Sequence, residues 1–287
     1  MLNQEEIIPA VSWQELQAQD LPQLSIILGG PDSGKTYLAR WLAQMMLDSG
    51  ETAAWIDGDI GQNFLGLPTT INMALLWADR EMPPPVHSTF FVGSTKAQGR
   101  SLALITGLKR LLELAQAKGV KKVLMDTTGF IDKASGGLDL KKWKLELLRP
   151  QNIICLQSDR ELEPVLAPWR KHPDLRILEP GFAPGLGKKT TEKRLQNRRR
   201  KFQEYFKGAT RHNLLVSAWP VHDLHLARRL SLVGLLDQEG FCVGLGVILE
   251  KSGQEIRICT ALDSLAQVAA LRVGTIRVDP GTGLELA

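Results

Sequence analysis

The sequence predicts an α/β protein in which a mainly parallel sheet carries helices on both faces, followed by a small β-rich C-terminal module. Short apolar runs alternate with longer helical patterns from residue 24 to about residue 157. After about residue 211 three strand-like runs follow one another across Gly-rich or polar turns, without a long helix between them. The first pattern is typical of parallel β-α-β units, and the second of an antiparallel sheet.

Each expected element follows from its own run of residues. Strands are expected at LSIIL (24–28), AAWID (53–57), TFFVG (89–93), KVLMD (122–126) and NIICLQ (152–157), and helices at 35–48 and 101–118. The C-terminal runs are FCVGLGVILE, QEIRICTAL and AALRVGTIRVD. The predicted domains are a lead-in at 1–23, an α/β domain at 24–215 with a basic segment near 188–207, and a β-rich domain at 216–287.

Composition indicates a globular protein of the cytoplasm. The chain has 287 residues, of which 44% are hydrophobic and 23% charged, so it can bury a substantial core. No run approaches the roughly 18 apolar residues that a membrane span needs, and the acidic start MLNQEEIIPA is unlike a basic secretory leader. The three cysteines, Cys155, Cys242 and Cys259, are scattered in strand-like runs and are expected to be reduced core residues.

A glycine-rich loop joins the first expected strand to the first expected helix. The segment GGPDSGKT fits the pattern G-x-x-x-x-G-K-[ST], in which backbone amides wrap a phosphate at a helix N-terminus. In this pattern Lys35 reaches the terminal phosphates and Thr36 binds Mg²⁺. The residues expected to hold a nucleotide, ATP or GTP, are Gly29, Gly30, Pro31, Asp32, Ser33, Gly34, Lys35, Thr36 and Tyr37.

Two expected strands end in carboxylates. Asp126 follows four apolar residues, which is the position of an aspartate that holds the Mg²⁺ water shell. Asp59 lies beyond the end of its strand, two residues after Asp57, and we expect it to accept the proton of an attacking hydroxyl and to lie near the metal. The alternative is that Asp57 or Asp59 caps a turn.

The order of motifs resembles the Clp1/Grc3 group of polynucleotide 5′-hydroxyl kinases. The phosphate loop, DGDIGQ, DTTGF and an arginine-rich helix ending in EYFKG match that family's loop, D-x-D-x-G-Q segment, T-x-G clasp and arginine lid. The resemblance runs through nearly everything after residue 24. The chain looks like a minimal form without the N-terminal β domain of eukaryotic members, and Phe130 stands where the clasp usually has Trp.

The resemblance implies roles for residues outside the loop. Arg194 and Arg198, spaced i, i+4, are similar to the lid arginines that stabilise charge on the migrating phosphoryl group. Gln62 is expected to position the Mg²⁺ water shell or the acceptor phosphate. The remaining substrate-binding candidates are the clasp residues Thr127, Thr128 and Gly129, together with Trp143 and Arg199.

The distribution of charge favours a chain of phosphates as the acceptor. Residues 188–211 contain ten Lys or Arg and two acidic residues, although the whole chain carries only +4. Lys141, Lys142 and Lys144 surround Trp143, which is either a platform for a terminal base or an ordinary core residue. A basic helix that merely faces solvent is the alternative for the lid.

The predicted reaction is direct in-line transfer of a γ-phosphate to the 5′-hydroxyl of RNA or DNA, with Mg²⁺. The alternatives are an NTP-hydrolysing switch and a nucleotide-bound scaffold without turnover. A standard GTPase is disfavoured because no N/T-K-x-D motif follows NIICLQ, where the chain has only Ser158 and Asp159. The sequence does not distinguish RNA from DNA or ATP from GTP, and it identifies no protein partner.

Overall fold

The computed structural model describes residues 9–14, 16, 21–50, 52–77 and 82–286. Most of the predicted lead-in, 1–23, lies outside these residues, apart from a short 3₁₀ turn at Val11–Trp13. No helix among the described residues is long and apolar enough to cross a membrane.

The first sheet has seven strands in the order β4-β3-β2-β5-β1-β6-β7. Strands β2, β5, β1, β6 and β7 are parallel to one another, and β1 and β2 are buried at every position, as expected for strands covered on both faces. The strands are β1 (Leu24–Gly29), β2 (Ala53–Gly58), β3 (Thr70–Leu76), β4 (Val86–Phe91), β5 (Lys122–Thr127), β6 (Asn152–Leu156) and β7 (Arg176–Leu178).

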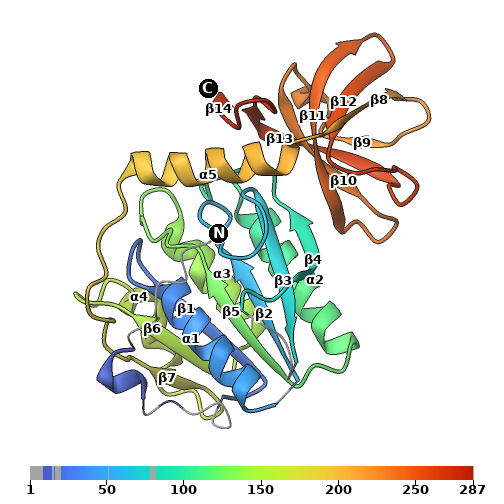
Figure 1. Cartoon of the computed structure of the whole chain (residues 1–287). Coiled ribbons are helices and arrows are strands. Elements are labelled where there is room, and N and C mark those ends of the chain that lie inside the picture. The colour runs from blue at the N-terminus through green and yellow to red at the C-terminus, as the bar shows by residue number, and fades with distance from the viewer. Residues whose placement is uncertain (1–8, 15, 17–20, 51, 78–81, 287) are drawn as a thin grey trace. The chain divides into compact units, whose positions relative to one another are not determined.

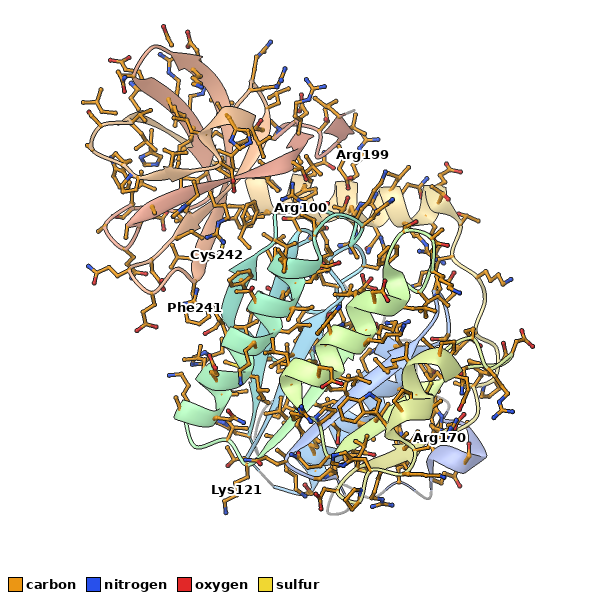
Figure 2. All side chains as sticks on the ribbon, turned by 180° about the vertical axis from the view of Figure 1, so that it is seen from behind. Arg100, Lys121, Arg170, Arg199, Phe241 and Cys242 are labelled. Atoms are coloured by element: carbon orange, nitrogen blue, oxygen red, sulfur yellow. The ribbon has the colours of Figure 1, made fainter. Side chains whose placement is uncertain are left out.

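Helices cover both faces of this sheet, which confirms the predicted class. Helix α1 lies on one face, and α2 and α3 lie on the other (Figures 1 and 2). The helices are α1 (Lys35–Asp48), α2 (Ser101–Ala117), α3 (Gly137–Leu148) and the short α4 (Glu163–Leu166), which a 3₁₀ turn at Ala167–Trp169 extends.

The sequence pattern located five of these seven strands. Strand β3 was not predicted, because Thr70 and Asn72 interrupt the apolar run TINMALL, although all seven residues are buried. Strand β4 runs from Val86 to Phe91, so it begins and ends earlier than the predicted 89–93. Its exposed first half, VHS, lacks the apolar pattern on which the prediction depended.

The second sheet contains β14-β13-β10-β11-β12-β8 in that order, and β9 pairs with β13. Its three predicted runs appear as β11 (Cys242–Ser252), β12 (Glu255–Thr260) and β13 (Ala270–Val278). The others are β8 (Thr210–Leu215), β9 (Val221–His222), β10 (Ser231–Leu236) and β14 (Glu285–Leu286), with a 3₁₀ turn at Leu224–Leu226. Helix α5 (Thr191–Phe206) precedes it and buries Phe202 and Phe206 in the same core.

The chain divides into two compact units that are discontinuous in sequence. The first unit comprises Met1–Asp59, Met73–His87 and Leu104–Lys189, and the second comprises Ile60–Asn72, Ser88–Ala103 and Thr190–Ala287. The phosphate loop belongs to the first unit and α5 to the second. The predicted sequence boundaries at 23/24 and 215/216 stay predictions. Cys155, Cys242 and Cys259 are free and buried in β6, β11 and β12, as predicted.

Candidate active site

The phosphate loop turns sharply between β1 and α1. Gly34 precedes the helix with φ 88°, a left-handed conformation that favours glycine, and Asp32 also has positive φ. The Lys35 ammonium donates to the carbonyl oxygen of Gly30 at 2.5 Å, and the Ser33 hydroxyl donates to the same oxygen at 3.0 Å. The loop is therefore wrapped on itself by its own lysine and serine.

Close packing leaves no room for larger side chains in the loop. A Cβ added to Gly29 would lie 2.9 Å from the backbone oxygen of Leu156 on β6. A Cβ at Gly34 would collide with the side chain of Leu186, whose segment precedes α5. Sequence reasoning did not identify Leu186, because it lies more than 150 residues after the loop in an irregular stretch.

Asp126 joins the loop from the end of β5. The Thr36 hydroxyl donates to Asp126 Oδ2 at 2.6 Å, and the backbone N–H of Thr127 donates to Asp126 Oδ1 at 2.7 Å. The predicted pair of Mg²⁺ ligands, one from the loop and one from a strand end, therefore lies within hydrogen-bonding distance. A hydroxyl and a carboxylate are hard oxygen donors of the kind that Mg²⁺ prefers.

Burial perturbs the acidity of Asp126. Its side chain is fully buried, and this raises its pKa from 3.8 to about 6. The positive charge of Lys35 and the hydrogen bond from Thr36 act in the opposite direction and favour the carboxylate. A divalent cation beside Asp126 would compete with the proton for the same oxygens, so cation binding and deprotonation are linked here.

Asp57 and Asp59 have different environments. Asp57 pairs in register with Asp126 on the neighbouring strand and is completely buried. Its Oδ1 accepts the backbone N–H of Asp59 at 3.1 Å, so Asp57 caps the turn, which was one of the two alternatives. Asp59 itself is half-buried one step beyond the strand end. Its role as a base stays a prediction.

The clasp segment packs on the phosphate loop. A Cβ at Gly129 would lie 2.8 Å from Pro31 Cα and 2.9 Å from Pro31 N. The Thr127 hydroxyl donates to the Ile27 carbonyl on β1 at 2.7 Å, which ties the start of the clasp to the strand that leads into the loop. The structure thus brings Gly129 and Pro31 together, as a segment closing on a bound nucleotide requires.

Two lysines near Trp143 are not where the sequence placed them. Lys141 and Lys144 are fully buried under α3, so the prediction that they form a basic track for phosphates is wrong. Their positions, i and i+3, lie on the inward face of the helix. Lys142 is exposed, and Trp143 is 66% exposed, which rules out the alternative that this tryptophan is a core residue.

One of the buried lysines contacts the clasp. The Lys141 ammonium donates to the Thr128 carbonyl of the clasp at 2.9 Å. Burial, together with the neighbouring charges of Lys144 and Lys35, holds the pKa of Lys141 well below its usual value. Burial also lowers the pKa of Lys144 to about 8. Sequence reasoning missed Lys141 as a clasp contact because only packing decides which helix face is buried.

Within the second unit, α5 carries the predicted lid arginines. The Gln62 amide donates to the Arg194 carbonyl at 3.2 Å, and Asn197 donates to the Gln62 side-chain oxygen at 3.4 Å, so Gln62 lies against the helix. Arg199, labelled in Figure 2, is exposed and donates to the Thr282 carbonyl at 3.1 Å. The roles predicted for these side chains remain predictions.

The fold and this loop define a class. A P-loop nucleotide-binding protein has a mainly parallel sheet, a G-x-x-x-x-G-K-[ST] loop after an inner strand, here β1, and a threonine–aspartate pair formed with the end of the neighbouring strand, here β5. A family model described as "mRNA cleavage and polyadenylation factor CLP1 P-loop" matches residues 29–208. The chain belongs to this family, which confirms the resemblance.

Curated relatives carry kinase names. The chain is 28% identical to the polyribonucleotide 5′-hydroxyl-kinase MJ1315 of Methanocaldococcus jannaschii, with 90% of this chain and 88% of that protein covered. It is 26% identical to the polyribonucleotide 5′-hydroxyl-kinase PYRAB01840 of Pyrococcus abyssi, with 92% and 90% covered. These matches extend over both units.

Solved structures share the fold. A chain of the wild-type Clp1p–Pcf11p complex superimposes with a TM-score of 0.68 at 13% identity, covering 89% of this chain and 74% of that one. A second Clp1p–Pcf11p structure, described as explaining ATP loss in a point mutant, gives a TM-score of 0.67 at the same identity, with 89% and 75% covered.

Proposed function

We propose that this protein is a polyribonucleotide 5′-hydroxyl kinase, which transfers the γ-phosphate of ATP to the 5′-hydroxyl end of RNA. The observation that carries the proposal is the Thr36–Asp126 pair beside a fully wrapped phosphate loop, in a chain whose curated relatives carry that kinase name over about nine-tenths of its length. The exposed lysines and arginines of α5 suit a polyanionic acceptor.

Thr36 and Asp126 would hold Mg²⁺, which neutralises charge on the terminal phosphates when bound. Their oxygens fit this ion. No group of three or more His, Cys, Asp or Glu that could form an all-protein metal cage occurs in the described part of the chain. This suits Mg²⁺, which usually keeps several waters and takes one or two carboxylates together with substrate phosphates.

The transfer itself is a single displacement. The bond between the γ-phosphorus and the bridging oxygen breaks, the bond from that phosphorus to the 5′-oxygen forms, and ADP leaves. Asp59 accepts the proton of the 5′-hydroxyl. Lys35 in the loop, and Arg194 and Arg198 in the lid, offset the charge of the migrating group. The clasp residues exclude water from the nucleotide, so that the γ-phosphate passes to the 5′-hydroxyl and is not hydrolysed.

Incubation with γ-labelled ATP or GTP, Mg²⁺ and a panel of acceptors tests the proposal. The panel comprises 5′-hydroxyl RNA, 5′-hydroxyl DNA, the same RNA with a 5′-phosphate, and no acceptor. We expect label on 5′-hydroxyl RNA, none on the 5′-phosphorylated RNA, and little free phosphate. Free phosphate independent of the acceptor would indicate a hydrolysing switch, and neither product would indicate a scaffold.

Two variants test the assigned chemistry. Lys35→Ala should abolish labelling together with most of the nucleotide affinity, because the loop loses the cation that reaches the phosphates. Asp59→Asn should abolish labelling with nucleotide affinity largely retained. Full labelling by Asp59→Asn would remove Asp59 from the role of base.

A further inference from the structure

A carboxylate from the end of the chain pairs with a predicted lid arginine. Within the second unit, Arg198 Nε donates to Glu285 Oε1, and Arg198 Nη2 donates to Glu285 Oε2 at 3.4 Å. The Thr95 hydroxyl donates to Oε2 of the same carboxylate at 3.2 Å. No sequence pattern indicates these contacts, because Glu285 lies 87 residues after Arg198 and 190 after Thr95.

This pair is more enclosed than the other ion pairs of α5. The side chains of Arg198 and Glu285 are 14% and 17% exposed, whereas those of Arg200 and Glu204 are 45% and 63% exposed. Exposed pairs contribute little to stability because water and salt screen them and both side chains lose rotamer freedom. A mostly buried, two-point pair holds a guanidinium in one orientation far more effectively.

The segment that delivers Glu285 is fitted closely to the helix. Asp279 Oδ1 accepts the backbone N–H groups of Gly281 and Thr282, both at 2.9 Å, which forms a tight turn after β13. Gly283 has φ 71°, and a Cβ there would lie 2.7 Å from the backbone nitrogen of Gln203 on α5. Only glycine can occupy this position without displacing the segment from the helix. The turn therefore sets the position along α5 at which β14 places the Glu285 carboxylate.

The paired guanidinium retains donors for a phosphate. Arginine carries five N–H donors, and Glu285 takes one from Nε and one from Nη2, which leaves three for other partners. A guanidinium already fixed in orientation loses less rotamer entropy when it binds a transferred phosphoryl group.

We propose that Glu285 is a positioning residue for Arg198, and that the C-terminal segment 279–286 thereby sets the geometry of the arginine lid. Glu285 touches neither the nucleotide nor the acceptor in this account. It acts through Arg198, and Thr95 fixes the carboxylate in turn. The inference rests on the proposed function, because it assumes that Arg198 stabilises the transferred phosphate.

Steady-state kinetics of Glu285→Ala, Glu285→Gln, Arg198→Ala and the double variant Arg198→Ala/Glu285→Ala tests this. We expect Arg198→Ala to lower kcat by about 100-fold or more. Glu285→Ala should lower kcat by about 10- to 100-fold, with the KM values for ATP and RNA within about threefold of the unaltered protein. Glu285→Gln, which keeps an acceptor for Nε–H, should retain more kcat than Glu285→Ala.

The double variant separates positioning from a general loss of structure. If Glu285 acts only through Arg198, the double variant is no slower than Arg198→Ala. The matched control is Glu204→Ala, which breaks an exposed carboxylate–arginine pair on the same helix and should leave kcat unchanged. An unchanged or faster kcat in Glu285→Ala, or a double variant slower than Arg198→Ala by the full Glu285→Ala factor, overturns the inference.

A second measurement does not depend on turnover. In ¹H–¹⁵Nε NMR spectra, the Arg198 Nε–H should be protected from solvent exchange in the unaltered protein and should lose protection in Glu285→Ala. Equal exchange in both proteins would contradict the ion pair itself. If the unaltered protein fails to label RNA although Arg198 Nε–H is protected, the proposed function fails and the pair has only a structural role. Labelling of RNA with unchanged kcat in Glu285→Ala contradicts the positioning role alone.

Discussion

Replacing Gly129 with alanine should weaken nucleotide binding, because the clasp packs on the phosphate loop. The added Cβ would lie 2.8 Å from Pro31 Cα and 2.9 Å from Pro31 N, which are backbone atoms that cannot rotate away. Ordinary contact of a Cβ with a heavy atom begins at 3.4 Å, so the clasp and the phosphate loop must separate by about 0.6 Å, the difference between 3.4 and 2.8.

The size of the effect follows from this displacement. Forcing one extra carbon into a close-packed site typically costs about 1–3 kcal/mol. The loop binds phosphate only when its amides converge on one point, so we expect this cost to appear mainly in binding. Since about 1.4 kcal/mol corresponds to a factor of ten, the Kd for ATP should rise by about 5- to 150-fold.

Titration calorimetry with ATP measures this Kd directly, and thermal unfolding of the same samples measures any part of the cost that falls on the free protein. Gly187→Ala is the matched control, because a Cβ there meets nothing within 4 Å. If Gly129→Ala has the same Kd and the same Tm as Gly187→Ala, the packing of the clasp on the loop does not support the site, and our reasoning is wrong.

Three further outcomes are expected. Asp126→Asn should be more stable than the unaltered protein at pH 8, by an amount on the order of a few kcal/mol, in urea unfolding with EDTA, and the difference in stability should become smaller at pH 5. The Asp126 carboxyl has a pKa of about 6 in the folded protein and 3.8 in the unfolded chain, so it stabilises the fold only while it is protonated. That stabilisation is lost as the pH rises through 6. A variant that is less stable than the unaltered protein at pH 8 would contradict this prediction. Lys141→Met should lower kcat/KM about tenfold because the Thr128 carbonyl loses its donor, whereas Lys118→Met, at an exposed lysine just after α2, should not. Equal kinetics in the two variants would remove Lys141 from the clasp. Trp143→Ala should raise the KM for RNA by about 5- to 150-fold with the KM for ATP unchanged. The KM for RNA of Trp143→Phe should lie between those of the unaltered protein and Trp143→Ala. An unchanged KM for RNA in Trp143→Ala excludes base stacking.

The fold class was predictable because its signals are local. Strands β1, β2 and β5 are apolar runs that lead into a glycine or an aspartate, and β6 is the short apolar run NIICL. The glycine-rich loop marks the passage from β1 to α1. Strand β3 was not predicted because the polar residues Thr70 and Asn72 interrupt its apolar run, although Gly66 and Pro68 precede it. The short β8 and β10 became evident only through their pairing with distant strands.

The site was predictable where it depends on motifs and not where it depends on packing. Thr36 and Asp126 were assigned from their patterns alone, and the Thr36 hydroxyl lies 2.6 Å from Asp126 Oδ2. Lys141 carries no such signal, since a lysine in a helix normally faces solvent. Glu285 pairs with Arg198 across 87 residues of chain, and a single carboxylate near the end of a sequence has no distinguishing pattern.

The most direct test of the account is a single-turnover experiment with excess protein, stoichiometric γ-labelled ATP, Mg²⁺ and 5′-hydroxyl RNA, quenched at successive times. If transfer is direct, label passes from ATP to the 5′ end of the RNA in one phase, without labelled protein and with little free phosphate. Label that appears first on the protein, or that is released as phosphate at the same rate with and without RNA, would contradict direct transfer to the 5′-hydroxyl.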